Sequence, residues 1–176
     1  MMWQLRGQTA VFKRAAVGLA AVNLILPIAL SDGAHAAEPQ RSYKAGELVI
    51  EAPWARATPG GATVGGGYLK ITNGGSEPDW LIGGSLPGAA FVEVHEMRME
   101  NGIAKMRKLD AGLEIRPGQT VELKPGGYHL MFQGLSAALK EGQSVTGTLV
   151  FQRAGTVEVE YHVALIGAAA SGHTRH

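Results

Sequence analysis

The sequence contains no cysteine among its 176 residues. This absence excludes disulfide bonds, thiol catalysis, cysteine-ligated zinc or iron–sulfur sites and lipid attachment at a cysteine. It also excludes a blue-copper electron-transfer centre, which needs a thiolate ligand. Neither sign of charge is in excess, since 16 Lys and Arg stand against 15 Asp and Glu. We therefore expect no nucleic-acid partner, because nucleic-acid-binding domains usually carry a clear basic surplus.

The first 36 residues predict a secretory signal peptide. Basic residues precede an apolar run over 15–30, and residues 34–36 form a small-x-small cleavage pattern. The alternative is a membrane anchor, but the apolar run is shorter than the roughly 20 residues that a spanning helix needs. We expect cleavage after Ala36, export to the periplasm and no membrane span in the mature form.

The rest of the chain predicts an all-β domain. Short runs rich in β-branched and aromatic residues alternate with Gly, Pro and Asn turn signals, which is typical of a β-sandwich or β-barrel. The strands are expected over 48–51, 68–72, 80–83, 91–100, 103–109, 120–124, 128–133, 145–152 and 156–165. The one helical candidate is 135–140. We assign 37–47 to an N-terminal arm, 48–166 to a single β domain and 167–176 to a flexible tail.

The dipeptide Asn101-Gly102 predicts a two-residue hairpin turn, because both central positions of such a turn need positive φ. In the resulting register Met97 lies directly opposite Met106. Side chains alternate between the two faces of a strand. The large apolar residues of 91–100 and 128–133 define the core face, which leaves His95, Met97, Met99, His129 and Met131 on the outer face.

Thioethers and imidazoles on one face indicate a soft metal ion. Together they form a neutral ligand set that suits Cu(I), whereas Ca²⁺ and Mg²⁺ prefer oxygen and Zn²⁺ seldom takes thioethers. A site without a thiolate suits a carrier that must also release its ion. The alternative from the residues alone is that the methionines fill gaps in the core and that the histidines are solvated. A Gly-x-Ser-x-Gly motif is absent from the sequence, and we do not expect an enzyme.

The spacing of these residues resembles that of the PCuAC family of periplasmic copper chaperones. The family pattern is a His, ten residues, a Met, about twenty-one residues and then His-x-Met. Here His95 is followed by ten residues and Met106, then by 22 residues and His129-Leu130-Met131. The added residue falls in a span with several turns, where one insertion is easily accommodated. Residues 54–60 and 71–73 also look like the N-terminal part of the family.

The resemblance implies a cupredoxin-like Greek-key β-barrel or sandwich. It implies that Cu(I) is bound by His95, Met106, His129 and Met131 and is delivered to the CuA centre in subunit II of cytochrome c oxidase. A Sco-type protein is implied as a further partner. The alternative function is a periplasmic copper-buffering or tolerance protein without a dedicated client. A metal-dependent enzyme or a plain adhesion-type β domain is a third reading.

Three further residues are candidates for auxiliary ligands. Met97 is expected beside Met106, where it would shield the site or replace a ligand during transfer. The tail carries His173 and His176, and it weakly resembles the His-containing tails of some relatives that help to bind Cu(II). Imidazoles are good Cu(II) donors. The alternative is a tail of disordered polar sequence without a ligand role.

Overall fold

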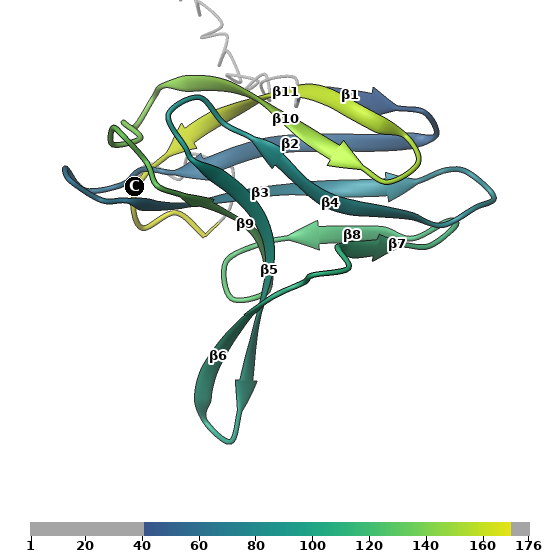
Figure 1. Ribbon diagram of the computed structural model, residues 1–176, viewed down its shortest axis with the longest axis horizontal. Coiled ribbons are helices and arrows are strands. Elements are labelled where there is room, and N and C mark those ends of the chain that lie inside the picture. The colour runs from purple at the N-terminus through teal and green to yellow at the C-terminus, as the bar shows by residue number, and fades with distance from the viewer. Residues whose placement is uncertain (1–40, 170–176) are drawn as a thin grey trace, which may run out of the picture. The chain divides into compact units, whose positions relative to one another are not determined.

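The computed structural model describes residues 41–169, which contain eleven β-strands and no helix (Figure 1). The strands are β1 (Ser42–Ala45), β2 (Leu48–Arg56), β3 (Val64–Asn73), β4 (Asp79–Ser85), β5 (Phe91–Glu100), β6 (Ile103–Lys108), β7 (Leu113–Ile115), β8 (Thr120–Leu123), β9 (Tyr128–Gln133), β10 (Ser144–Phe151) and β11 (Gly155–Ala164). The predicted all-β class is therefore confirmed.

The strands form one strongly curled sheet. Strand β2 pairs with both β11 and β3, so the series β2–β11–β10–β4–β5–β9–β3 returns to its starting strand. The β11–β2 pairing is parallel and the others in the series are antiparallel. Strands β4 and β5 share a single residue pair, Gly84 with Val92. The pairing around the sheet is shortest at this point, so the fold is closer to a sandwich than to a regular barrel.

The core lies inside this curl. Every second residue of the strands points inward, and the fully buried side chains include Ile50, Ile71, Phe132 and Tyr161. The rings of Phe132 and Tyr161 meet edge to face at 5.6 Å. Gly67 makes room for this pair, because a Cβ at that position would lie 2.4 Å from Cζ of Phe132.

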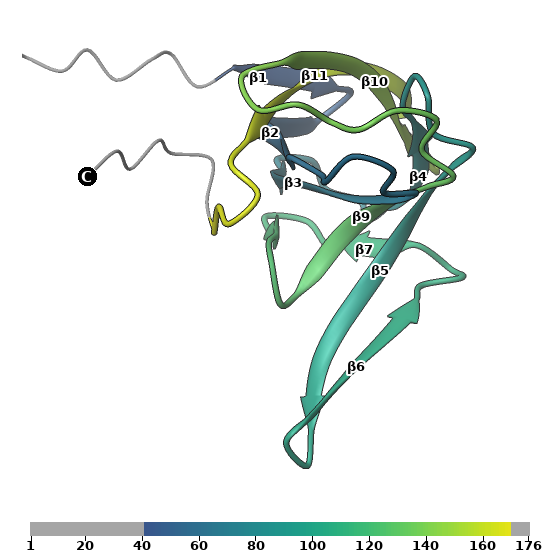
Figure 2. The same ribbon diagram turned by 90° about the vertical axis from the view of Figure 1, so that its left-hand side faces the viewer.

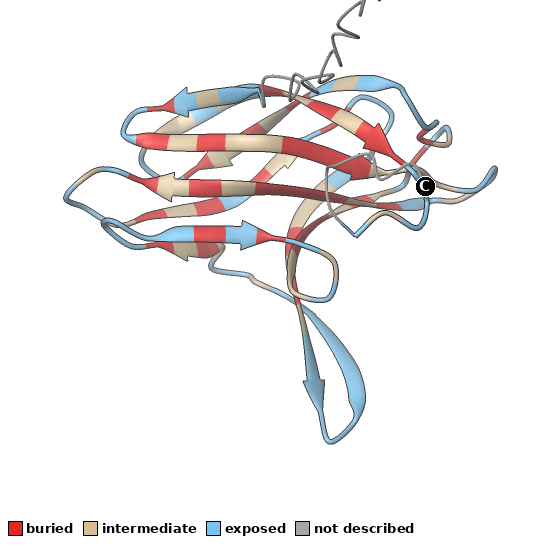
Figure 3. Ribbon diagram, turned by 180° about the vertical axis from the view of Figure 1, so that it is seen from behind, coloured by how far each residue is buried: buried red, intermediate tan, exposed pale blue. Residues whose placement is uncertain are grey.

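The β5–β6 hairpin extends beyond the rest of the sheet (Figures 1 and 2). Strand β5 pairs with β9 as far as Glu96 opposite Tyr128, and beyond that point its register partners lie on β6 alone. Every residue of β6 is exposed (Figure 3). One half of β5 is thus part of the sandwich, and the other half forms a hairpin that is open to solvent.

Three expectations from sequence need correction. The described part of the predicted N-terminal arm contains β1, which pairs with β2 in a tight hairpin. Strand β7 was not predicted, because three residues are too few to show a periodic pattern. The predicted helix over 135–140 is irregular chain. There, the Leu139 carbonyl accepts the backbone N–H of Thr58, and the Leu139 N–H donates to Oγ1 of the same threonine. Leu135 and Leu139 are buried against Gly65.

The predicted signal peptide, its cleavage after Ala36 and the histidines of the tail lie outside the described residues. Within 41–169, no helix has the length and apolar character needed to cross a membrane.

Candidate metal centre

The hairpin register predicted from Asn101-Gly102 is confirmed. Met97 lies directly opposite Met106, and the pairing continues to Glu100 opposite Ile103. Asn101 and Gly102 have φ values of 52° and 78°, as a two-residue turn with two left-handed positions requires. The turn therefore brings a methionine of β6 beside the outer face of β5.

The pairing of β5 with β9 joins the two halves of the motif. His95 lies directly opposite His129, and Met131 lies opposite Glu93, one step further along the same face. On the other side of β5, His95 lies opposite Lys108, which places Met106 diagonal to the imidazole. The four predicted ligands thus lie on neighbouring positions of one sheet face, from three adjacent strands.

The ring of His129 is held by a backbone carbonyl. Its Nδ1 lies 3.0 Å from the carbonyl oxygen of Gly127. The same carbonyl accepts the backbone N–H of Met97. With the Nδ1–H donated to this carbonyl, Nε2 keeps its lone pair for a metal ion. Burial lowers the pKa of His129, while the Gly127 carbonyl opposes that shift and the nearby His95 adds to it.

The burial of His129 differs from the expectation of an open outer-face residue, since only 7% of it is exposed. The His95 ring covers part of it, with ring centroids 5.8 Å apart and planes at 43°. Two imidazoles that share one metal ion at bonds of about 2 Å have centroids roughly 5–6 Å apart. The two rings are therefore close to the separation that a shared ion needs.

His95 is held by a carboxylate. Its Nε2 lies 3.0 Å from Oε2 of Glu93, and 12% of its side chain is exposed. Its Nδ1 is buried and has no hydrogen-bond partner within residues 41–169. Glu93 also accepts hydrogen bonds from Lys108 and Gln133. The hydrogen bonds from Lys108 and then from His95 lower the pKa of Glu93, so the group is a carboxylate at neutral pH.

The methionines range from half-buried to open. Met131 and Met97 are half-buried, whereas Met106 is 47% exposed and Met99 is 68% exposed. In the part of the chain that the structure describes, no three His, Asp or Glu side chains are close enough to hold a metal ion. A metal at this face would need the thioethers as well, and that donor set fits Cu(I) better than it fits harder ions.

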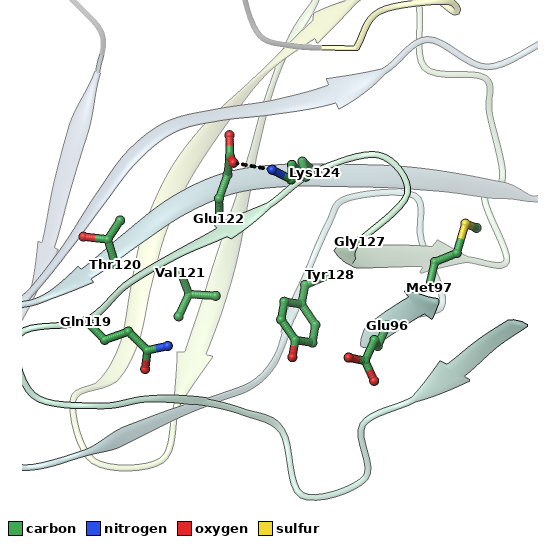
Figure 4. A pocket seen from close by; sticks show the side chains of 9 residues that line it. All are labelled: Glu96, Met97, Gln119, Thr120, Val121, Glu122, Lys124, Gly127 and Tyr128. Atoms are coloured by element: carbon green, nitrogen blue, oxygen red, sulfur yellow. Dashed lines mark hydrogen bonds and ion pairs between the residues drawn. The ribbon is translucent and has the colours of Figure 1, made fainter. Parts of the chain in front are cut away.

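Glu96 lies on the opposite face of β5. Its buried carboxylate accepts hydrogen bonds from Nε and Nη2 of Arg107 at 2.9 and 2.7 Å and an ion pair from Arg98 at 2.6 Å. It lines a groove of about 400 Å³ between β8 and the base of the hairpin (Figure 4). None of the four predicted ligands lines this groove, but Met97 and Gly127 do, so it borders the His/Met face.

An aromatic cluster adjoins the His/Met face on the side of β3. Gly66 lies opposite Met131, and a Cβ on Gly66 would lie 2.6 Å from the hydroxyl oxygen of Tyr68. The Tyr68 ring packs on Trp54 at 4.4 Å, and Ala168 packs on the same pair. Arg56 donates a hydrogen bond to the Ala168 carbonyl. Ala168 is thus held two strands away from Met131.

The sequence reasoning missed Glu93 and Gly127 as parts of the site. Glu93 could have been found, because it lies two residues before His95 and therefore on the same face. The contact of Gly127 with His129 depends on the turn before β9, and the sequence pattern carries no signal for it. His173 and His176 lie outside the described residues.

Comparisons with known proteins agree with this picture. The family model described as "Putative lipoprotein LpqE-like" matches residues 48–163. The putative lipoprotein Lxx21020 of Leifsonia xyli subsp. xyli is 33% identical over 110 residues, which are 62% of this chain and 65% of that protein. The chain therefore spans just under two thirds of the length of this relative. The sequence of the present protein contains no cysteine.

Two solved structures of copper proteins share the fold. The copper-bound PCuAC domain from PmoF2 superposes with a TM-score of 0.62 at 28% identity, over 72% of this chain and 99% of that domain. The solution structure of CuI-DR1885 from Deinococcus radiodurans gives 0.52 at 28% identity, over 64% and 74% of the two chains. These matches confirm the cupredoxin-like fold expected from the sequence.

Proposed function

Because this chain belongs to the LpqE-like family of PCuAC-type copper chaperones, we propose that it is an exported carrier that binds one Cu(I) through His95, Met106, His129 and Met131. One observation carries the proposal: the two histidines lie opposite each other on β5 and β9, with a methionine diagonal to His95 on each side. The matched domain from PmoF2 holds copper and DR1885 holds Cu(I), which supports the choice of metal.

The donor set suits transfer as well as binding. Neutral imidazole and thioether ligands stabilise Cu(I), but they bind it less firmly than thiolates do. Met106 is 47% exposed on a hairpin that is open to solvent, so an incoming ligand can reach the ion from that side. Met97 lies beside Met106 and can occupy a vacated position during exchange. The site therefore combines two oriented imidazoles with one accessible, replaceable thioether.

The first test is a competition titration of the purified protein with a colorimetric Cu(I) chelator. The expected result is one Cu(I) per chain, with protection of the ion against the chelator. A protein that left all Cu(I) with a weak chelator would contradict the proposed function. The titration uses the full chain without its first 36 residues.

We further propose that the client is the CuA domain in subunit II of cytochrome c oxidase, with a Sco-type protein as co-worker. The test mixes Cu(I)-loaded protein with the apo CuA domain and follows the CuA absorption bands under controlled oxidation. Transfer faster than from a Cu(I)–chelator complex of equal affinity supports a delivery role. Equal rates would favour the alternative, a copper-buffering or tolerance protein without a dedicated client.

We also propose that the protein acts in the periplasm after removal of residues 1–36. The support is the pattern of a basic segment, an apolar run and a small-x-small site in the sequence. The expected N-terminus of the exported protein is Ala37. Intact-mass measurement on protein recovered from the periplasm tests this, and a mass that includes the first 36 residues would contradict it.

We also propose that the tail gives the protein a second mode of copper binding, in which His173 and His176 add nitrogen donors for Cu(II). The support is the position of Ala168, which packs on Trp54 and Tyr68 beside the His/Met face. Strands β2, β3 and β9 are consecutive neighbours, so β2 and β9 are about 10 Å apart. His173 lies five positions after Ala168, a distance of at most about 17 Å along the chain, so its imidazole can reach the site.

A further inference from the structure

We propose that Glu93 is a positioning residue of the copper site, and that it holds His95 so that Nδ1, rather than Nε2, is presented to the ion. The inference rests on the proposed function for the identity of the metal. The orientation of His95 is a property of the protein itself and can be measured without copper.

Glu93 is anchored from three strands. Its Oε2 lies 3.0 Å from Nε2 of His95 on β5, and its Oε1 accepts a hydrogen bond of 2.8 Å from Nζ of Lys108 on β6. Gln133 on β9 donates a third hydrogen bond to Oε2. Lys108 is also the direct register partner of His95. The carboxylate is therefore fixed from both neighbours of β5, and its place is not that of a solvated surface glutamate.

An acceptor held in this way determines which nitrogen of His95 carries the proton. A carboxylate accepts but cannot donate, so Nε2 must be the N–H, and in the neutral imidazole that binds a metal Nδ1 then keeps the lone pair. This Nδ1 is buried without a hydrogen-bond partner among the described residues. A buried acceptor that lacks a partner costs free energy, and a bound metal ion would remove that cost. The arrangement is that of a carboxylate–histidine–metal triad.

The two histidines then present different nitrogens to the same ion. His129 has its Nδ1 at the Gly127 carbonyl, which leaves Nε2 for the metal. His95 has its Nε2 at Glu93, which leaves Nδ1. In the opposite role, Glu93 would block copper from Nε2 of His95 and so lower copper affinity. Removing the carboxylate would then raise copper affinity, whereas removing a positioning residue lowers it.

The test compares wild-type protein, Glu93→Ala, Glu93→Gln and the matched control Glu122→Ala. Glu122 is a glutamate that pairs with a lysine, Lys124, at 3.0 Å, but it lies on β8, which pairs with β3 and not with β5, β6 or β9. Two quantities are measured: the ¹⁵N chemical shifts of the imidazole nitrogens with and without Cu(I), and the Cu(I) affinity by competition. Thermal unfolding of each variant shows whether it folds.

In wild-type protein we expect Cu(I) to shift Nδ1 of His95 and Nε2 of His129. Glu93→Ala should lower Cu(I) affinity by about 10- to 100-fold, the usual effect of losing an outer hydrogen-bond partner of a metal ligand. Glu93→Gln keeps an acceptor oxygen and should retain the Nδ1 selectivity, with a smaller loss. Glu122→Ala should change neither quantity. If Glu93 had only a structural role, Glu93→Ala would lower the stability of the protein without changing which nitrogen of His95 binds copper.

Three results would overturn the inference. They are a Cu(I)-induced shift at Nε2 of His95 in wild-type protein, a Glu93→Ala variant that binds Cu(I) as tightly as wild type or more tightly, and an Nδ1–H tautomer of His95 in the copper-free protein. If wild-type protein bound no Cu(I), the proposed function would fail. The tautomer in copper-free protein would still decide the inference about Glu93.

Discussion

His95 and His129 lie directly opposite each other on strands β5 and β9, with ring centroids 5.8 Å apart. Thirty-three residues separate them in the sequence, and the pairing of β5 with β9 brings them together. Each ring has one nitrogen tied to a protein acceptor, Glu93 or the Gly127 carbonyl. Ligands that are oriented before binding lose little conformational entropy when the metal arrives, and this favours tight binding.

Met106→Ala should weaken Cu(I) binding by at least about tenfold, or roughly 1.4 kcal/mol, because the site loses one of four ligands. Stability should hardly change, since Met106 is 47% exposed. Met99→Ala is the matched control, because Met99 lies further along the same hairpin face and is 68% exposed. Competition titration and thermal unfolding check both effects. Equal losses of affinity in the two variants would mean that the methionines of the hairpin contribute interchangeably, and that Met106 is not a specific ligand.

The parts of this site that sequence could predict are those that depend on local structure. The pairing of Met97 with Met106 follows from a two-residue turn, because loop length fixes the register of a hairpin. The alternation of side chains assigned His95, His129 and Met131 to the correct face of their strands. The choice of these residues as ligands came from the family resemblance and not from periodicity.

The parts that sequence could not predict depend on pairing between distant strands. The burial of His129 follows from the position of His95 directly opposite it, and nothing in residues 128–133 specifies that neighbour. The same holds for the position of Gln133 beside Glu93. Residues 135–140 were the one helical candidate, but Leu135 and Leu139 are buried as irregular chain against Gly65. Tertiary packing here outweighs local propensity.

Gly67→Ala should destabilise the domain by about 1–3 kcal/mol, because the new methyl group overpacks the core. Its Cβ would lie 2.4 Å from Cζ of the buried Phe132 ring. Gly60→Ala is the control, since nothing lies within 4 Å of its Cβ position. Gly60→Ala should leave the free energy of unfolding unchanged or raise it by up to about 1 kcal/mol, because alanine makes the unfolded chain stiffer. Urea unfolding measures both, and equal stabilities of the two variants would contradict this account of the core.

The ion pairs of Glu96 should make stability depend on pH in the acid range. Burial by itself raises the pKa of Glu96, but the hydrogen bonds from Arg107 and Arg98 outweigh it, and the pKa ends below its usual value of 4.5. A carboxyl whose folded-state pKa is depressed stabilises the fold fully above its unfolded-state pKa. That contribution is lost as the pH falls through the folded-state pKa.

Glu96→Gln should therefore lower the free energy of unfolding at pH 7 and have a shrinking effect as the pH falls below about 4.5. Urea unfolding of wild type and variant between pH 3 and pH 7 measures the difference. Glu122→Gln serves as the control, because Glu122 is exposed and its ion pair with Lys124 is solvated. A Glu96→Gln effect that stayed constant over this range would mean that packing, and not charge, is the source.

The tail should affect Cu(II) and leave Cu(I) nearly unchanged. Cu(II) prefers nitrogen and oxygen donors in tetragonal geometry, so the two imidazoles of His173 and His176 can complete a set begun by His95 and His129. The fixed position of Ala168 near the site gives these tail residues a high effective concentration there. The double variant His173→Ala/His176→Ala keeps the chain length, and Thr174→Ala/Arg175→Ala is the control of equal size.

We expect the double histidine variant to bind Cu(II) at least about tenfold more weakly and to lose nitrogen couplings in its electron paramagnetic resonance spectrum, because two donors are removed. Its Cu(I) affinity should match that of wild type, since thioethers and the two oriented imidazoles hold that ion. Wild-type Cu(II) affinity should also fall below about pH 6, as the tail imidazoles take up protons. Identical Cu(II) spectra and affinities for wild type, control and double variant would exclude the tail as a source of ligands.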